Sequence, residues 1–186
     1  MGFVFAKSPR RISPLKASLL AGRLHPSLRK VGVFVDPDID ELFRIVEQVG
    51  LDGVQLQGTE TPAFLEAIRS RGSSLFLAKV VRATSRKAVE SVRNFDVDAI
   101  FVDTKDPAQP EAESQRVEVS WLSGLSDVPL VVAGGLDATN VAEVVKEVRP
   151  WGVDVSGGVE TSPGRKDATK VQAFVRAVRE AEVAVT

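Results

Sequence analysis

The stretch PLVVAGGLDATNVAEVVKEVRPWGVDVSGGVE, residues 129–160, decides the fold of this chain. It contains two short apolar runs, Leu130–Ala133 and Val153–Val155, which are followed by the glycine pairs Gly134–Gly135 and Gly157–Gly158. Between the runs, valines recur at three- and four-residue spacing, which predicts an amphipathic helix. The order strand, glycine turn, helix, strand, glycine turn is typical of an α/β protein.

The two glycine pairs indicate a phosphate site. Glycine has no Cβ and adopts positive φ readily, so a glycine turn can bring backbone N–H groups within hydrogen-bond distance of an anion. Two such turns after consecutive late strands resemble the phosphate site of a (β/α)8 barrel, which the loops after strands seven and eight form. The alternative is that the glycines only allow tight turns, but two pairs at equivalent positions favour phosphate.

The composition is that of an ordinary globular protein. Of 186 residues, 44% are hydrophobic and 26% charged, and the formal net charge is −1. This balance gives no reason to expect a nucleic acid or an anionic membrane as partner, and no apolar run approaches the roughly 20 residues that span a bilayer. Cysteine is absent, which excludes disulfides and cysteine-based metal sites within these residues. We expect one domain over residues 1–186, in the cytoplasm.

Strand and helix patterns alternate along the whole chain with a period of about 25 residues. We expect strands at Gly2–Phe5, Lys30–Val35, Gly53–Leu56, Ser74–Val80, Ala99–Val102, Leu130–Ala133 and Gly152–Val155. Their short, continuous apolar character predicts a parallel sheet that is buried on both faces. Ser13–Pro14 and Thr61–Pro62 predict helix starts. The last helix is expected at about Asp167–Glu182, and the polar stretch Thr104–Ser120 is expected to be a long loop.

Six longer motifs occur in a fixed order: GFVFAKSPRRISP, VGVFVDPD, LDGVQLQGTETP, FVDTK, VVAGGLDATNV and VRPWGVDVSGGVETSPGRKD. In this order and spacing they resemble the phosphoribosylanthranilate isomerase family of tryptophan biosynthesis, from the first residue to about residue 179. The resemblance implies a (β/α)8 TIM barrel that here lacks its first βα unit. It also implies an Amadori rearrangement of N-(5-phosphoribosyl)anthranilate to 1-(2-carboxyphenylamino)-1-deoxyribulose 5-phosphate, with no metal and no organic cofactor.

That rearrangement needs an acid to protonate the furanose ring oxygen and a base to remove the proton from C2 of the sugar. Asp103, at the end of a strand, matches the family's general acid, and barrel enzymes place catalytic groups at such strand ends. An isolated aspartate there would otherwise be interpreted as a loop cap.

The resemblance also assigns the substrate-binding residues. Arg10 matches the arginine over the anthranilate carboxylate, a group that a guanidinium suits, although the adjacent Arg11 leaves this assignment open by one position. Asp154 matches a position near the ribose, with a polar residue of the barrel interior as the alternative. The phosphate site is matched by Gly134, Gly135, Gly157 and Gly158.

Three features depart from the family pattern. Family members begin with a strand carrying Lys-Ile-Cys-Gly, whose cysteine is the general base, and a helix, before they reach GFVF. Neither that strand nor that cysteine is present here. Gln57 stands where the family usually has histidine, and glutamine can form hydrogen bonds but cannot titrate. The glycine-rich loop after the catalytic acid is replaced by a segment without glycine between Asp103 and Gly124.

Three interpretations follow. In the first, the natural protein is longer and an upstream βα unit of about 25 residues restores eight strands. In the second, the chain is a degenerate paralogue that binds phosphosugars or pairs with another chain, as Gln57 and the altered loop favour. The third is another phosphosugar isomerase or epimerase, which the motifs ETSPGRKD and KSPRR disfavour. We expect a phosphoribosyl ligand and a chain that, taken alone, is nearly inactive as an isomerase and poorly soluble or oligomeric. Two unpaired strand edges and bared apolar helix surface would favour aggregation or pairing into a homodimer.

Overall fold

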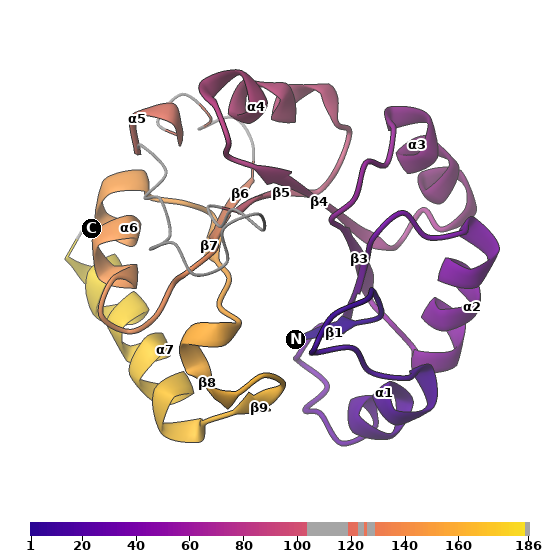
Figure 1. The fold of residues 1–186 in the computed structure, drawn as a ribbon, viewed down its shortest axis with the longest axis horizontal. Coiled ribbons are helices and arrows are strands. Elements are labelled where there is room, and N and C mark those ends of the chain that lie inside the picture. The colour runs from indigo at the N-terminus through magenta and orange to yellow at the C-terminus, as the bar shows by residue number, and fades with distance from the viewer. Residues whose placement is uncertain (104–118, 123–124, 126–128, 185–186) are drawn as a thin grey trace. The chain divides into compact units, whose positions relative to one another are not determined.

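The computed structural model describes residues 1–103, 119–122, 125 and 129–184. It divides into two compact units, the first made of Met1–Val80 and Asn94–Asp98, the second of Val81–Arg93 and Ala99–Thr186. In each unit, parallel strands alternate with helices along the chain (Figure 1). The α/β class is therefore confirmed, while the expectation of a single domain stays a prediction.

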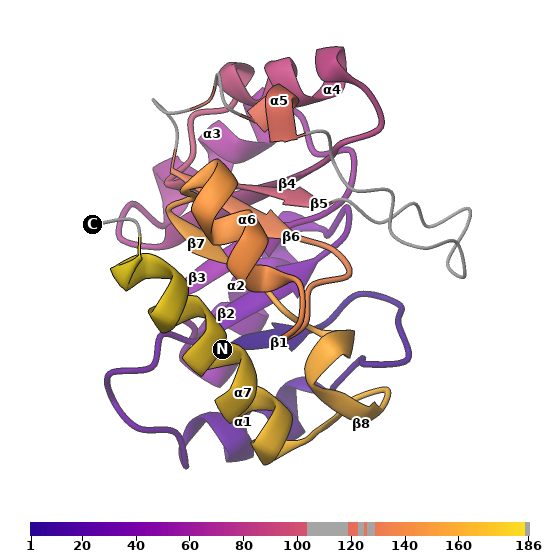
Figure 2. The ribbon, with the colours of Figure 1, turned by 90° about the vertical axis from the view of Figure 1, so that its left-hand side faces the viewer.

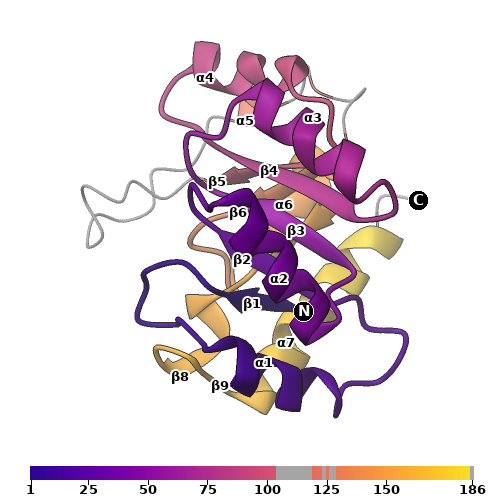
Figure 3. The same ribbon diagram turned by 90° about the vertical axis from the view of Figure 1, so that its right-hand side faces the viewer.

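The first unit contains four parallel strands in chain order. They are β1 (Gly2–Val4), β2 (Val31–Phe34), β3 (Gly53–Leu56) and β4 (Phe76–Arg82), which continues into the second unit. The helices between them are α1 (Pro14–Ala21), α2 (Ile39–Val49) and α3 (Pro62–Arg71), which lie along the strands (Figure 3). The core forms where helix and strand side chains meet, and Leu42, Leu56, Leu65, Ile68 and Leu77 are almost completely buried there.

The helix starts follow from local capping. Ser13 Oγ accepts a hydrogen bond from the Lys16 backbone N–H (3.3 Å), and Thr61 Oγ1 accepts one from Phe64 N–H (3.3 Å). Each cap satisfies a backbone donor that the first helical turn leaves without a partner. The two helix starts expected at Ser13–Pro14 and Thr61–Pro62 are confirmed.

The second unit contains the parallel strands β5 (Ala99–Asp103), β6 (Leu130–Ala133) and β7 (Gly152–Val153), in chain order. The other elements are α4 (Arg86–Glu90), the 3-10 helix η1 (Ser91–Asn94) that runs into the first unit, α5 (Val119–Leu122), α6 (Val141–Val148), the 3-10 helix η2 (Gly157–Val159), the antiparallel hairpin β8 (Glu160–Ser162) and β9 (Arg165–Lys166), and α7 (Ala168–Val183). Helices α6 and α7 pack against each other (Figure 2).

The observed boundaries differ from the expected ones at a few places. Strand β7 ends at Val153, two residues early, and the chain then turns into η2, although the Asp154 N–H still bonds to the Val132 carbonyl (2.9 Å). The expected loop Thr104–Ser120 ends inside α5, which begins at Val119, and residues 104–118 lie outside the described part of the chain. No helix in the described residues combines the length and apolar character that crossing a membrane requires.

Candidate active site

Three neighbouring strands of the second unit end side by side, and each end carries a residue expected in the site. Asp103 closes β5 and is paired in register with Ala133 of β6, the residue before the first glycine turn. Asp154 follows β7 directly, and its N–H bonds to the Val132 carbonyl. Carboxyl ends of parallel strands are where α/β barrels carry their active sites. The structure thus brings Asp103, Gly134 and Asp154 to one edge of the sheet.

The first glycine turn has the left-handed conformation that its sequence predicts. Gly134 and Gly135 have φ of 91° and 65°, values that strain residues with a Cβ. Asn140 Nδ2 donates to the Gly135 carbonyl (3.0 Å), and Asn140 Oδ1 accepts from Asp137 N–H (2.9 Å). Asp137 Oδ1 in turn accepts from the Thr139 hydroxyl (2.6 Å) and N–H (2.7 Å). The hydrogen bond from the Thr139 hydroxyl is the main reason that the pKa of Asp137 is lowered.

The second glycine pair behaves differently from the first. Gly157 and Gly158 lie in the short helix η2 and do not have positive φ. Glycine is needed at Gly158 for space, because a Cβ there would overlap the carbonyl oxygen of Leu136 and lie 2.9 Å from Asp137 Cβ. The two glycine segments therefore lie directly against each other.

The carboxyl group of Asp154 has a raised pKa. Burial raises the pKa of its carboxyl group, the negative charge of Asp103 raises it further, and the positive charge of Lys166 opposes both effects. Water nevertheless reaches much of the Asp154 side chain, so this elevation is smaller than that of a fully enclosed acid. The opposing effects place Asp103 and Lys166 within electrostatic reach of Asp154.

A buried glutamate organises the segment after the second glycine pair. Glu160 Oε1 accepts from Lys166 Nζ (2.9 Å) and from Gly164 N–H (3.2 Å), and only 4% of the Glu160 side chain is exposed. Lys166 Nζ also donates to the Ser156 carbonyl (2.9 Å). The motif ETSPGRKD contains both charged residues, but the motif alone does not reveal that they reach back to the glycine turn.

Arg10 and Gln57 lie in segments of the first unit that follow β1 and β3. Arg10 is half-buried in the loop after β1, and its backbone N–H donates to Ser8 Oγ (3.1 Å). The neighbouring Arg11 is exposed, and the assignment of Arg10 as the carboxylate-binding residue stays a prediction. Gln57 directly follows β3, where its N–H bonds to the Phe34 carbonyl (2.9 Å).

A buried ion pair contacts the loops that follow β2 and β3. Lys79 Nζ lies 2.9 Å from Glu60 Oε2, and 4% and 2% of the two side chains are exposed. Glu60 Oε1 accepts from Asp36 N–H (2.9 Å) and Gly58 N–H (3.1 Å), and Lys79 Nζ donates to the Gly58 carbonyl (2.7 Å). The pair thus connects the loop after β2 to the loop after β3. Sequence reasoning did not find it, because charged residues are usually exposed.

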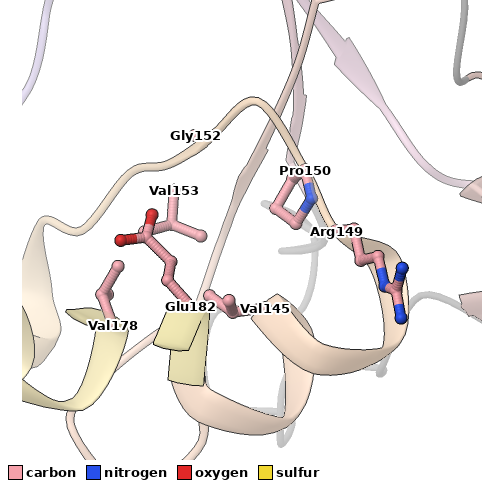
Figure 4. A pocket seen from close by; sticks show the side chains of 7 residues that line it. All are labelled: Val145, Arg149, Pro150, Gly152, Val153, Val178 and Glu182. Atoms are coloured by element: carbon pink, nitrogen blue, oxygen red, sulfur yellow. The ribbon is translucent and has the colours of Figure 1, made fainter. Parts of the chain in front are cut away.

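A cavity of about 340 Å³ in the second unit is a different feature from the strand-end site (Figure 4). It lies beside β7, where Val153 faces Val145 of α6 and Val178 and Glu182 of α7. Val153 directly precedes Asp154, but the residues that line the cavity include neither Asp154 nor a residue of the two glycine turns. Among the described residues, no group of three or more His, Cys, Asp or Glu side chains is arranged to hold a metal ion.

Comparison with known proteins places these features in a family. The sequence profile of the family described as N-(5'phosphoribosyl)anthranilate (PRA) isomerase matches residues 1–177. The chain is 39% identical over 179 residues to the N-(5'-phosphoribosyl)anthranilate isomerase of Geobacter sp. (strain M21), a match that covers 94% of this chain and 84% of that protein.

Solved structures agree with this match. The crystal structure of phosphoribosyl anthranilate isomerase from Thermotoga maritima superposes with a TM-score of 0.86 at 33% identity, covering 96% of this chain and 87% of that one. A further structure of the same enzyme concerns monomers generated from its dimeric form. A phosphoribosyl anthranilate isomerase in complex with reduced 1-(o-carboxyphenylamino)-1-deoxyribulose 5-phosphate has a TM-score of 0.82 at 32% identity, covering 96% of this chain and 86% of that one. The TIM-barrel type of fold is confirmed.

Proposed function

Because the chain belongs to the N-(5'-phosphoribosyl)anthranilate isomerase family, we propose that its substrate is N-(5'-phosphoribosyl)anthranilate. The reaction is the Amadori rearrangement of tryptophan biosynthesis, which converts the aminoaldose into 1-(2-carboxyphenylamino)-1-deoxyribulose 5-phosphate. The observation that carries this proposal is the alignment of Asp103, the first glycine turn and Asp154 at the ends of three neighbouring strands. This arrangement can hold an acid, a phosphate and a sugar together.

Each of these residues has one proposed task. Asp103 donates a proton to the furanose ring oxygen while the lone pair of the anthranilate nitrogen forms a C1=N bond, so that the C1–O bond breaks and the ring opens. Asp154 lies beside the sugar and interacts electrostatically with Asp103. Arg10 binds the anthranilate carboxylate through its guanidinium group.

The 5-phosphate is bound by the two glycine segments. The positive φ of Gly134 and Gly135 turns the backbone sharply after β6, and Gly158 allows η2 to lie against that turn. Backbone N–H groups in such closely packed turns are suited to a phosphate. No step of the proposed reaction calls for a metal ion or an organic cofactor.

A binding experiment tests the proposed substrate class. The reduced product analogue and its dephosphorylated counterpart are titrated into the protein by calorimetry. The phosphorylated compound should bind at least about tenfold more tightly, since it adds several hydrogen bonds to a charged group. Equal affinity for the two compounds would show that the glycine segments are only turns.

A second candidate function is a phosphosugar-binding paralogue without isomerase activity. Gln57, in the position where the family usually has histidine, favours it, because a glutamine side chain cannot exchange a proton. Turnover by a chain extended with a strand–helix segment that carries Lys-Ile-Cys-Gly distinguishes the two functions. An isomerase converts the fluorescent anthranilate adduct and loses activity when Asp103 is replaced by Asn, whereas the paralogue binds the analogue without turnover.

Assembly and location complete the proposal. A homodimer is supported by the exposed leucines of α1, since Leu15 and Leu19 are 68% and 64% exposed, and by the dimeric relative from Thermotoga maritima. Large exposed apolar side chains that cluster on one helix indicate an interaction surface. Sedimentation should give a dimer that the double substitution Leu15→Lys, Leu19→Lys converts to a monomer. An unchanged mass would contradict this surface.

We place the activity in the cytoplasm, because phosphorylated sugars do not cross membranes freely.

A further inference from the structure

One lysine of the β8–β9 hairpin reaches back to the second glycine segment. Lys166 Nζ donates to the carbonyl of Ser156 (2.9 Å), the residue that immediately precedes Gly157. We propose that Lys166 is a positioning residue for phosphate binding, which fixes the Ser156–Val159 turn and holds a positive charge beside the site. This inference rests on the proposed function and adds a residue that the sequence motifs left without a role.

The first support is the way Lys166 is held. Its ammonium group lies 2.9 Å from Glu160 Oε1, and the Glu160 side chain is only 4% exposed. A carboxylate that has lost its water is stabilised strongly by a hydrogen-bonded cation, and removal of that cation is costly. Glu160 therefore keeps the lysine in one orientation, with its Nζ on the Ser156 carbonyl.

The second support is that the charge remains accessible. The Lys166 side chain is 43% exposed, and an ammonium group has three N–H donors. Two of these donors are used by the Ser156 carbonyl and Glu160 Oε1. An anion can therefore approach the same ammonium group from solvent.

The third support is the location of this charge. Lys166 acts on Asp154 strongly enough to oppose the rise of its pKa, to which Asp103 contributes. The lysine is thus within electrostatic reach of Asp154. A bound phosphate would add negative charge next to these carboxylates, and a fixed cation reduces the resulting repulsion.

The turn held by Lys166 also supports the other glycine segment. A Cβ at Gly158 would overlap the Leu136 carbonyl, so little space separates η2 from the loop after Gly135. A shift of the Ser156–Val159 turn would therefore disturb both glycine segments. Loss of Lys166 should weaken phosphate binding through position as well as through charge.

The experiment compares the affinity gained from the phosphate group in the wild-type chain and in variants. The reduced product analogue and its dephosphorylated counterpart are each titrated by calorimetry, and the ratio of their dissociation constants is the readout. Lys166→Met should lower this ratio by about tenfold or more, as expected for a lost hydrogen bond to a charged group. Affinity for the dephosphorylated compound should stay unchanged.

Two further variants separate position from charge. Lys166→Arg keeps the charge and can bond to Ser156 and Glu160, so it should restore most of the ratio. Lys166→Gln keeps a donor for the Ser156 carbonyl without the charge, and it should give an intermediate ratio. Lys170→Met is the matched control. Lys170 Nζ donates to the backbone carbonyl of Glu160 (2.8 Å) but has no bond to Ser156. It should leave the ratio unchanged.

The outcomes distinguish this inference from the proposed function. If the wild-type chain itself binds both compounds equally, the phosphate site of the proposed function is wrong. If the wild-type chain prefers the phosphorylated compound and Lys166→Met keeps that preference, the phosphate site stands and the role of Lys166 is refuted. A ratio that falls equally in Lys170→Met and Lys166→Met would also refute it, because the effect would then be one of general surface charge.

Discussion

Gly134 and Gly158 are both glycines of the candidate phosphate site, yet each is needed for a different physical reason. Gly134 has φ of 91°, a conformation that the sequence pattern predicts for a turn after a strand. Gly158 has ordinary φ and is needed because the Leu136 carbonyl occupies the space of a Cβ. The sequence indicates a glycine pair in both places, but it cannot distinguish a dihedral requirement from a close approach between distant segments.

The first prediction concerns Gly158→Ala. The added methyl group must displace the Leu136 carbonyl, so η2 moves away from the first glycine turn. We expect a loss of at least about 1–3 kcal/mol in the free energy of unfolding, typical of overpacking, together with loss of phosphate-dependent affinity. Urea titration and calorimetry measure the two effects. Gly152→Ala is the control, because its Cβ would meet only Val131 at 3.6 Å. Equal behaviour of the two variants would contradict the prediction.

The second prediction concerns the pH dependence of stability. Because the pKa of Asp154 is raised in the folded chain, the native state binds more protons than the unfolded state above pH 3.8, the ordinary value. The contribution of the Asp154 carboxyl group to stability therefore falls as the pH rises from 3.8 through the raised pKa of the folded chain. Its ionised form is destabilising at neutral pH. Asp154→Asn should be more stable than the wild type at pH 7, and the difference should vanish below about pH 3.8.

Asp137→Asn provides the opposite sign. The Thr139 hydroxyl lowers the pKa of Asp137, so ionised Asp137 stabilises the native state at neutral pH and this stabilisation is lost on acidification. Urea midpoints at pH 7 should therefore rise for Asp154→Asn and fall for Asp137→Asn. Shifts in the same direction for both variants would show that these carboxyl groups do not act through their charge.

At the level of elements, the apolar runs identified the strands well and their ends less well. Strands β3 and β6 have the bounds that their sequences predict, because glycine turns or polar residues close them locally. Strand β7 ends two residues early, and the chain then turns into η2, where Gly158 lies against the Leu136 carbonyl. This contact joins segments far apart in the sequence, and periodicity cannot detect such a contact.

The third prediction concerns the Glu60–Lys79 pair, which connects the loops after β2 and β3 to the middle of β4. Lys79→Met leaves the Glu60 carboxylate buried without its cation, and such a loss typically costs about 3–5 kcal/mol of unfolding free energy. Adding Glu60→Gln should recover much of this loss, because the amide oxygen still accepts from Asp36 and Gly58. Arg86→Met, which breaks the exposed Arg86–Glu90 pair, should cost no more than about 0.5 kcal/mol. A Lys79→Met cost as small as that of Arg86→Met would contradict this prediction.

For the whole molecule, the order of motifs predicted the family correctly, because strand ends and glycine turns are local signals that keep their spacing along the chain. The roles of Asp103, Arg10 and Asp154 came from the resemblance and stay predictions. The Glu60–Lys79 and Glu160–Lys166 pairs could not be predicted, since a charged residue in a sequence shows neither its burial nor its distant partner.

The last prediction concerns catalysis by the 186 residues taken alone. The resemblance assigns the general base to a cysteine, and this sequence contains none. A positioned general base contributes a factor of about 10²–10⁴ to the rate. We therefore expect the chain to bind the reduced product analogue but to convert the fluorescent substrate slowly. A strand–helix segment carrying Lys-Ile-Cys-Gly, joined ahead of Gly2, should raise turnover by about the same factor.

Two controls make this prediction specific. The same segment with its cysteine replaced by serine should restore no turnover, which separates the chemistry of the base from a gain in stability. Asp103→Asn in the extended chain should abolish turnover while leaving affinity for the analogue largely intact, because the acid acts on the ring oxygen during the reaction. Fast turnover by the 186-residue chain itself would instead mean that a residue within this sequence removes the C2 proton, and a search for that base would begin at the carboxyl ends of its strands.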